Sequence, residues 1–134
     1  MKPEHLFVYG TLRSDARSEM YHLLARFADF IGDATFQGQL YLVDDYPGVV
    51  PSTCSEDKVN GEVYRLLDPA SVLPKLDAYE ECGPGFPQPA EYVRRKERVF
   101  LKSSDEIEAW MYIYNRSTNG LRRIETGDFA SLHR

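Results

Sequence analysis

The sequence has few of the residues that build metal centres and disulfide frameworks. It contains two cysteines, Cys54 and Cys82, and three histidines scattered along 134 residues. Two thiols are too few for a disulfide framework or a four-thiolate zinc site. No H-x-x-x-H or C-x-x-C pairing occurs either. We therefore expect reduced thiols, no bound metal and a cytoplasmic protein.

Long apolar runs and an excess of basic charge are also missing. No run approaches the roughly 20 apolar residues of a transmembrane helix. The N-terminus lacks the basic segment and long apolar core of a signal peptide. The formal net charge is −5, whereas binding to a nucleic-acid backbone needs a basic face. The sequence thus predicts neither a membrane nor a nucleic-acid partner.

What the chain does have is the composition of one folded, β-rich unit. Hydrophobic residues make up 43% of the chain and charged residues 28%, which is typical of a globular protein. The length suits a single domain with one ordinary core. Aromatic residues reach 13% and favour a β-rich protein with a lined cavity. We predict one domain spanning residues 1–134.

Short apolar segments predict five or six strands, most of them antiparallel neighbours. The first ends at Gly10, and a turn at Ser103–Asp105 joins the last two as a hairpin. Proline and glycine punctuate Asp44–Gly48, which predicts a loop, and the tail from Asn115 is expected to be irregular. The predicted strands are His5–Tyr9, Phe30–Val43, a short piece at Val49–Val50, Val59–Leu66, Glu91–Leu101 and Ile107–Tyr114.

Two short helices are expected beside these strands. An apolar stripe predicts one over about Ser18–Phe27. The other begins at Pro69, after Asp68 as a capping residue, although Pro74 removes a backbone donor and could make the helix start afresh there. The predicted fold is α+β, a small mixed β-barrel of five to six strands with two flanking short helices, because closure removes exposed strand edges. An open α+β sheet is the alternative.

The second predicted helix carries a candidate catalytic carboxylate. Leu73, Leu76 and Glu80 recur at i, i+3 and i+7 and share one helix face. Burial of a carboxyl group raises its pKa, so Glu80 could take and return a proton near neutral pH. The alternative is a solvated glutamate at a frayed helix end, with Asp77 and Glu81 as ordinary surface acids.

Three further segments could contribute to a site. The turn Gly10–Arg13 can aim several backbone N–H groups at one anion, although a glycine after a strand is in most cases only a turn. Glu81–Ala90 holds two glycines and three prolines, so it is expected to be a loop, either a lid or a surface connection. Arg94 lies on a predicted strand, where it is either part of an exposed polar face or holds a carboxylate.

Seven short motifs follow one another across nearly the whole chain. They are Phe7-Val-Tyr-Gly-Thr-Leu12, Gly38-Gln-Leu-Tyr41, Tyr46-Pro-Gly48, Val59-Asn-Gly-Glu-Val-Tyr64, Leu76-Asp-Ala-Tyr-Glu80, Tyr92-x-Arg94 and Ala109-Trp-Met-Tyr-Ile-Tyr114. In residues and in order they resemble the motifs of the γ-glutamylcyclotransferase-like proteins, and among them the γ-glutamylamine cyclotransferases. Two features depart from the family pattern: Glu81 stands where members usually have glycine, and the insertion up to Ala90 is longer than in the simplest members. Both departures bear on the leaving-group preference.

The resemblance implies an enzyme that cyclises a γ-glutamyl amine or γ-glutamyl amino acid to 5-oxoproline, with Glu80 as general acid/base. It implies no cofactor, and a small γ-glutamyl molecule as the partner. A non-catalytic binding or regulatory module on the same fold is the alternative, because one fold hosts many functions. The implied substrate-binding residues are Tyr9, Gly10, Thr11 and Leu12. Arg94 is a candidate to assist with the substrate carboxylate, and Tyr92 and Tyr114 are candidates to orient polar groups.

Overall fold

The computed structural model describes residues 4–9, 22, 26–43, 46–79 and 90–129. The helix expected over about 18–27 therefore falls largely outside the described residues. The predicted site residues Gly10, Thr11, Leu12 and Glu80 also lie outside the described residues. Of the predicted loop Glu81–Ala90, only Ala90 is described.

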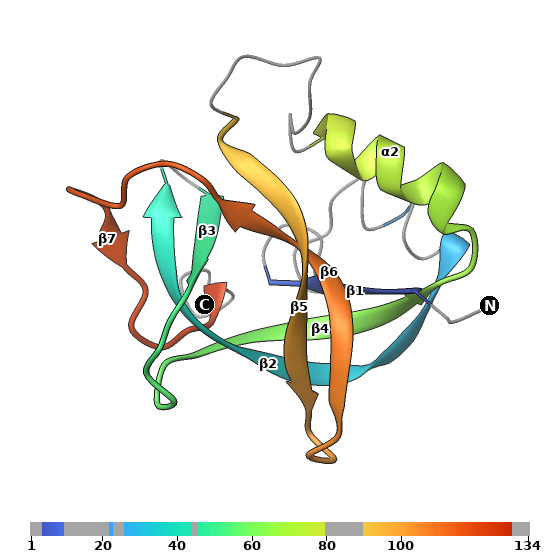
Figure 1. Ribbon diagram of the computed structural model, residues 1–134, viewed down its shortest axis with the longest axis horizontal. Helices are drawn as coiled ribbons and strands as arrows, with labels where there is room; N and C mark the ends of the chain where they lie inside the picture. Colours follow the sequence, from blue (N-terminus) through green and yellow to red (C-terminus); the bar gives the residue numbers. More distant parts are fainter. Residues whose placement is uncertain (1–3, 10–21, 23–25, 44–45, 80–89, 130–134) are drawn as a thin grey trace.

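Five strands close into a mixed β-barrel, as predicted (Figure 1). A pairing of Ala34 with Leu101, and of Thr35 with Phe100, joins the last strand of the ring to the first. The pair that includes Leu6 and Trp110 is parallel, and the other pairs are antiparallel. In ring order the strands are β2 (Ala28–Val43), β4 (Lys58–Leu66), β1 (Glu4–Val8), β6 (Glu106–Tyr114) and β5 (Tyr92–Leu101).

Two more strands extend the end of β2 beyond the ring. They are β3 (Tyr46–Pro51) and β7 (Arg122–Arg123), and both pair antiparallel with β2. The predicted loop at Asp44–Gly48 is thus wrong for its last three residues, which begin β3. Pro47 is tolerated because β3 ends the strand order, and an edge strand leaves one row of N–H groups without a strand partner. The tail is also more ordered than predicted, because β7 lies within it.

Side-chain alternation along the strands divides the apolar residues between two clusters. On β1, Phe7 belongs to a barrel cluster to which all five ring strands contribute. Leu6 and Val8 belong instead to a helix cluster, which includes residues of helix α2 (Pro69–Tyr79). The barrel cluster also takes Ile124 and Phe129 from the tail. The helix therefore covers the outer face of β1 and its neighbours.

Helix α2 is held by its buried side chains and continues through a proline. Leu73 and Leu76 face the core with 8% and 0% exposure, which confirms the predicted buried face for these two leucines. Pro74 cannot donate to the carbonyl of Ala70, but both residues are exposed, so water can satisfy that carbonyl. The helix consequently does not need to start afresh at Pro74. Neither α2 nor any other helical stretch that the structure describes is long and apolar enough to cross a membrane.

Candidate functional site

Asp77, on the last described turn of α2, accepts hydrogen bonds from three donors on the sheet. Arg94 donates from Nε to Oδ1 at 2.8 Å and from Nη2 to Oδ2 at 3.1 Å. The Tyr112 hydroxyl donates to Oδ1 at 2.7 Å. Arg94 on β5 and Tyr112 on β6 are paired in register, so their side chains leave the same face of the barrel. Two parallel N–H bonds from one guanidinium fix the orientation of the carboxylate.

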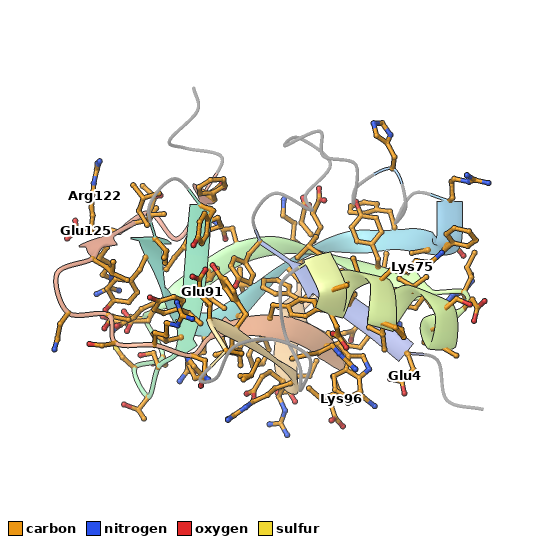
Figure 2. The ribbon with its side chains drawn as sticks, turned by 90° about the horizontal axis from the view of Figure 1, so that it is seen from above. Glu4, Lys75, Glu91, Lys96, Arg122 and Glu125 are labelled. Carbon is orange, nitrogen blue, oxygen red and sulfur yellow. The ribbon has the colours of Figure 1, made fainter. Side chains whose placement is uncertain are left out.

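The guanidinium of Arg94 also contacts an aromatic ring. It lies 4.5 Å from the ring centroid of Trp110, within the range of a cation–π contact. The indole nitrogen of Trp110 donates to Glu4 at 3.1 Å, and Glu4 forms an ion pair with Lys96 at 2.9 Å (Figure 2). The hydrogen bond from Lys96 is the main reason that the pKa of Glu4 lies below its usual value. The position of Arg94 is therefore set by packing as well as by Asp77.

Tyr9 lies at the end of β1, immediately before Gly10, and is buried. Its hydroxyl donates to the main-chain carbonyl of Tyr112. Tyr112 thus accepts from Tyr9 through its backbone and donates to Asp77 through its side chain. Tyr112 therefore connects Tyr9, which precedes the predicted anion-binding turn in the sequence, to Asp77, which lies three residues before Glu80.

Tyr92 and Tyr114 form a buried aromatic wall of the helix cluster. Their ring centroids are 5.8 Å apart, and the hydroxyl of Tyr92 donates to the carbonyl of Pro47 at 2.6 Å. Gly48 follows on β3, where an added Cβ would lie 3.0 Å from Cβ and Cγ of Tyr114. These contacts tie β3 to β5 and β6. Both tyrosines share the helix cluster with Leu76, so they lie on the barrel face that α2 covers.

Sequence reasoning named Asp77 only as an ordinary surface acid, in the alternative reading of Glu80, and did not single out Glu62. Asp77 has a side chain only 24% exposed, unlike an ordinary surface acid. The observed β5–β6 register pairs Arg94 with Tyr112, whereas a turn formed by Ser103–Asp105 would pair Arg94 with Tyr114, so the sequence offers no signal for Asp77. Glu62 is the one charged side chain buried in the described part of the chain, and it accepts from the Tyr64 hydroxyl at 3.1 Å.

Metal-ligating groups do not converge in the described residues. Over 4–9, 22, 26–43, 46–79 and 90–129, no group of three or more His, Cys, Asp or Glu side chains could hold a metal ion.

Comparisons with known proteins match nearly the whole chain. The model of the family described as gamma-glutamyl cyclotransferase, AIG2-like, matches residues 6–131. The chain is 38% identical over 125 residues to the gamma-glutamylcyclotransferase family protein YtfP of Escherichia coli strain K12, which is 92% of this chain and 94% of that protein.

Solved structures agree with this match. The solution structure of ytfP from Escherichia coli has a TM-score of 0.65 at 33% identity, covering 97% of this chain and 99% of that one. The crystal structure of an AIG2-like protein from Mus musculus has a TM-score of 0.69 at 21% identity, covering 89% of this chain and 82% of that one. The mouse protein is similar in fold.

Proposed function

The chain belongs to the gamma-glutamyl cyclotransferase, AIG2-like family, and we propose that it converts a γ-glutamyl amine or γ-glutamyl amino acid to 5-oxoproline and a free amine. The family match over residues 6–131 is the observation that carries the proposal. The contacts that join Tyr9 and Asp77 through Tyr112 support it. They link the two chain segments that would have to meet around the substrate.

The reaction is an intramolecular aminolysis. The α-amine of the substrate attacks its own γ-carbonyl, a new C–N bond closes the five-membered lactam, and the C–N bond to the leaving amine breaks. Because the nucleophile is already tethered to the carbonyl, the protein mainly has to hold the bent conformer of the substrate. Orientation of this kind can contribute about 7–11 kcal/mol to lowering a barrier.

Proton transfer is the second requirement. At neutral pH the α-amine is an ammonium group, which cannot attack until it loses a proton. Glu80 takes that proton and delivers it to the departing nitrogen. The attacking nitrogen loses a second proton as the ring closes, and this proton passes to the freed amine or to solvent, so the carboxyl group ends the cycle as it began. A positioned acid/base group contributes about 10²- to 10⁴-fold to such a reaction.

Main-chain donors supply the binding of negative charge. The N–H groups of Gly10, Thr11 and Leu12 would bind either the oxyanion or the α-carboxylate of the substrate. Tyr9 precedes this turn, and its side chain is fixed by its bond to Tyr112. The buried wall of Tyr92 and Tyr114 would exclude water from the barrel face that α2 covers. No step of this mechanism requires a metal or a cofactor.

Product analysis over a substrate panel tests the proposal. Purified protein is incubated with γ-glutamyl dipeptides and with γ-glutamyl-ε-lysine, and 5-oxoproline and the released amine are measured together. We expect equimolar formation of both products from at least one substrate, and the relative rates identify the leaving group. Tight binding without turnover across the panel would contradict the proposal and favour a binding or regulatory module.

A further inference from the structure

Tyr112 is bonded to both segments that flank the proposed site. Its backbone carbonyl accepts from Tyr9, and its hydroxyl donates to Asp77. Tyr9 directly precedes Gly10, and Asp77 precedes Glu80 by three residues. We infer that Asp77, Arg94 and Tyr112 form a positioning cluster, which holds the end of α2 in register with the end of β1 so that Glu80 meets the substrate in a fixed geometry. This inference rests on the proposed function.

The geometry of the cluster is suited to positioning. Both carboxylate oxygens of Asp77 accept a bond from Arg94, and Oδ1 accepts a second bond from Tyr112. A carboxylate held at both oxygens cannot rotate without breaking at least one charge-assisted bond. The donors come from two neighbouring strands of the barrel, which is the rigid part of the fold. The helix end is therefore fixed relative to the sheet along more than one direction.

The role of Arg94 in this cluster requires an arginine. The guanidinium of Arg94 lies over the Trp110 ring, and its Nε and Nη2 groups donate to the carboxylate of Asp77. A lysine would keep the positive charge, but an ammonium group cannot make two parallel bonds or stack in the same way. Arg94 thus acts through Asp77 and is a positioning residue. A direct contact of Arg94 with the substrate carboxylate, for which it is a candidate from the sequence, is not needed for this role.

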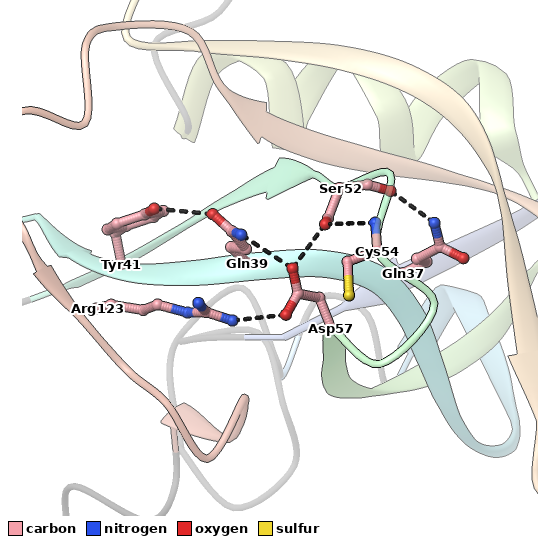
Figure 3. Close-up of polar contacts among 7 residues, drawn as sticks. All are labelled: Gln37, Gln39, Tyr41, Ser52, Cys54, Asp57 and Arg123. Carbon is pink, nitrogen blue, oxygen red and sulfur yellow. Dashed lines mark hydrogen bonds and ion pairs between the residues drawn. The ribbon is translucent and has the colours of Figure 1, made fainter.

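A second carboxylate cluster elsewhere in the fold provides a matched control. Asp57 accepts from the Ser52 hydroxyl at 2.6 Å, from the Gln39 amide at 2.9 Å and from Arg123 at 2.8 Å (Figure 3). These bonds tie the segment between β3 and β4 to β2 and β7. The partners of Asp57 lie on β2, on β7 and in the segment before β4, whereas those of Asp77 lie on β5 and β6, so the two sets of partners share no strand. Asp57 shares the chemistry of Asp77 but does not share its position three residues before Glu80 in the sequence.

The test compares turnover in single variants of the two clusters. We expect Asp77→Asn, Arg94→Lys and Tyr112→Phe to lower kcat for γ-glutamyl substrates. A displacement of about 1 Å at a reacting group can cost on the order of 100-fold, so losses of about 10- to 100-fold are expected for Asp77→Asn and Arg94→Lys. KM should stay within about twofold of wild type, because the substrate contacts remain. Asp57→Asn should leave kcat unchanged.

Further measurements separate positioning from general destabilisation. Urea unfolding identifies variants that have lost their fold, and Tyr112→Phe, which keeps the ring and the backbone carbonyl, remains informative if Asp77→Asn does not fold. The double variant Asp77→Asn/Arg94→Lys should lose no more activity than the worse single variant, because the two side chains act as a unit.

The outcomes distinguish this inference from the proposed function. If the wild-type protein forms no 5-oxoproline from any γ-glutamyl substrate, the proposed function fails and the inference falls with it. If the wild type is active and folded Asp77→Asn and Arg94→Lys keep kcat within twofold, the inference is overturned and the function stands. Full activity of Arg94→Lys together with a loss in Asp77→Asn would also overturn it, because charge alone would then suffice.

Discussion

The attachment of α2 to the barrel depends on Leu76, and Leu76→Ala measures that attachment. The side chain is fully buried in the helix cluster, with 0% exposure. The helix has only 11 residues, which is too short to be stable in water by itself. Pro74 further removes one of its internal hydrogen bonds. Its stability must therefore come from the packing of its apolar face against the sheet.

The expected loss follows from this burial. Transfer of a leucine side chain out of water contributes about 1.5–3 kcal/mol, and leucine-to-alanine changes in packed cores cost about 3–5 kcal/mol once the remaining cavity is included. We expect Leu76→Ala to lower the free energy of unfolding by about 3–5 kcal/mol, a large part of the 5–15 kcal/mol typical of a domain.

Urea unfolding followed by circular dichroism provides the measurement. Ser71→Ala is the control, because Ser71 is exposed on the same helix and such changes alter stability by about 0.5 kcal/mol or less. A loss below about 1 kcal/mol for Leu76→Ala would show that the helix is not held by this packing.

Three further changes test other contacts. Gly61→Ala should destabilise by about 1–3 kcal/mol or more in urea unfolding, because the added Cβ would lie 2.3 Å from the carbonyl oxygen of Val8; wild-type stability would contradict this. The hydrogen bond from Ser52 is the main cause that lowers the pKa of Asp57 to about 2. The ionised Asp57 should therefore stabilise the fold fully above about pH 4, and this stabilisation should be lost as the pH falls towards 2. Asp57→Asn should reduce the dependence of the free energy of unfolding on pH between about 4 and 2, and an unchanged dependence in that range would refute the assignment. Tyr92→Phe should cost about 1–3 kcal/mol, because it leaves a buried β3 carbonyl without its 2.6 Å donor; an unchanged urea midpoint would argue against that bond.

Periodicity was sufficient to predict most of the barrel but not its edge. The apolar strands of the ring and the buried face of Leu73 and Leu76 follow from local pattern, because the local backbone conformation sets which face of a strand or helix each side chain occupies. Tyr46-Pro47-Gly48 carries the punctuation of a turn, and local pattern therefore predicts a loop. It is a strand because the end of β2 offers it a pairing partner, and a proline can be accommodated at a sheet edge.

The candidate site depends on contacts between segments that are distant in sequence. Asp77 lies 17 residues from Arg94 and 35 from Tyr112, and Tyr9 lies 103 residues from Tyr112. No local pattern marks an aspartate whose partners arrive from other strands. The sequence could indicate which residues belong to the region through family motifs, whereas the bonds that join them required the tertiary structure.

We propose that Glu80 transfers the protons in a cyclisation that forms 5-oxoproline. The most direct measurement is the rate of 5-oxoproline formation by wild-type protein and by Glu80→Gln, at the same substrate concentration and with folding verified for both. Glutamine keeps the size of the side chain but cannot take up the ammonium proton. We predict a loss of about 10²- to 10⁴-fold, or about 3 kcal/mol or more of transition-state stabilisation. Equal rates for the two proteins would contradict the mechanism.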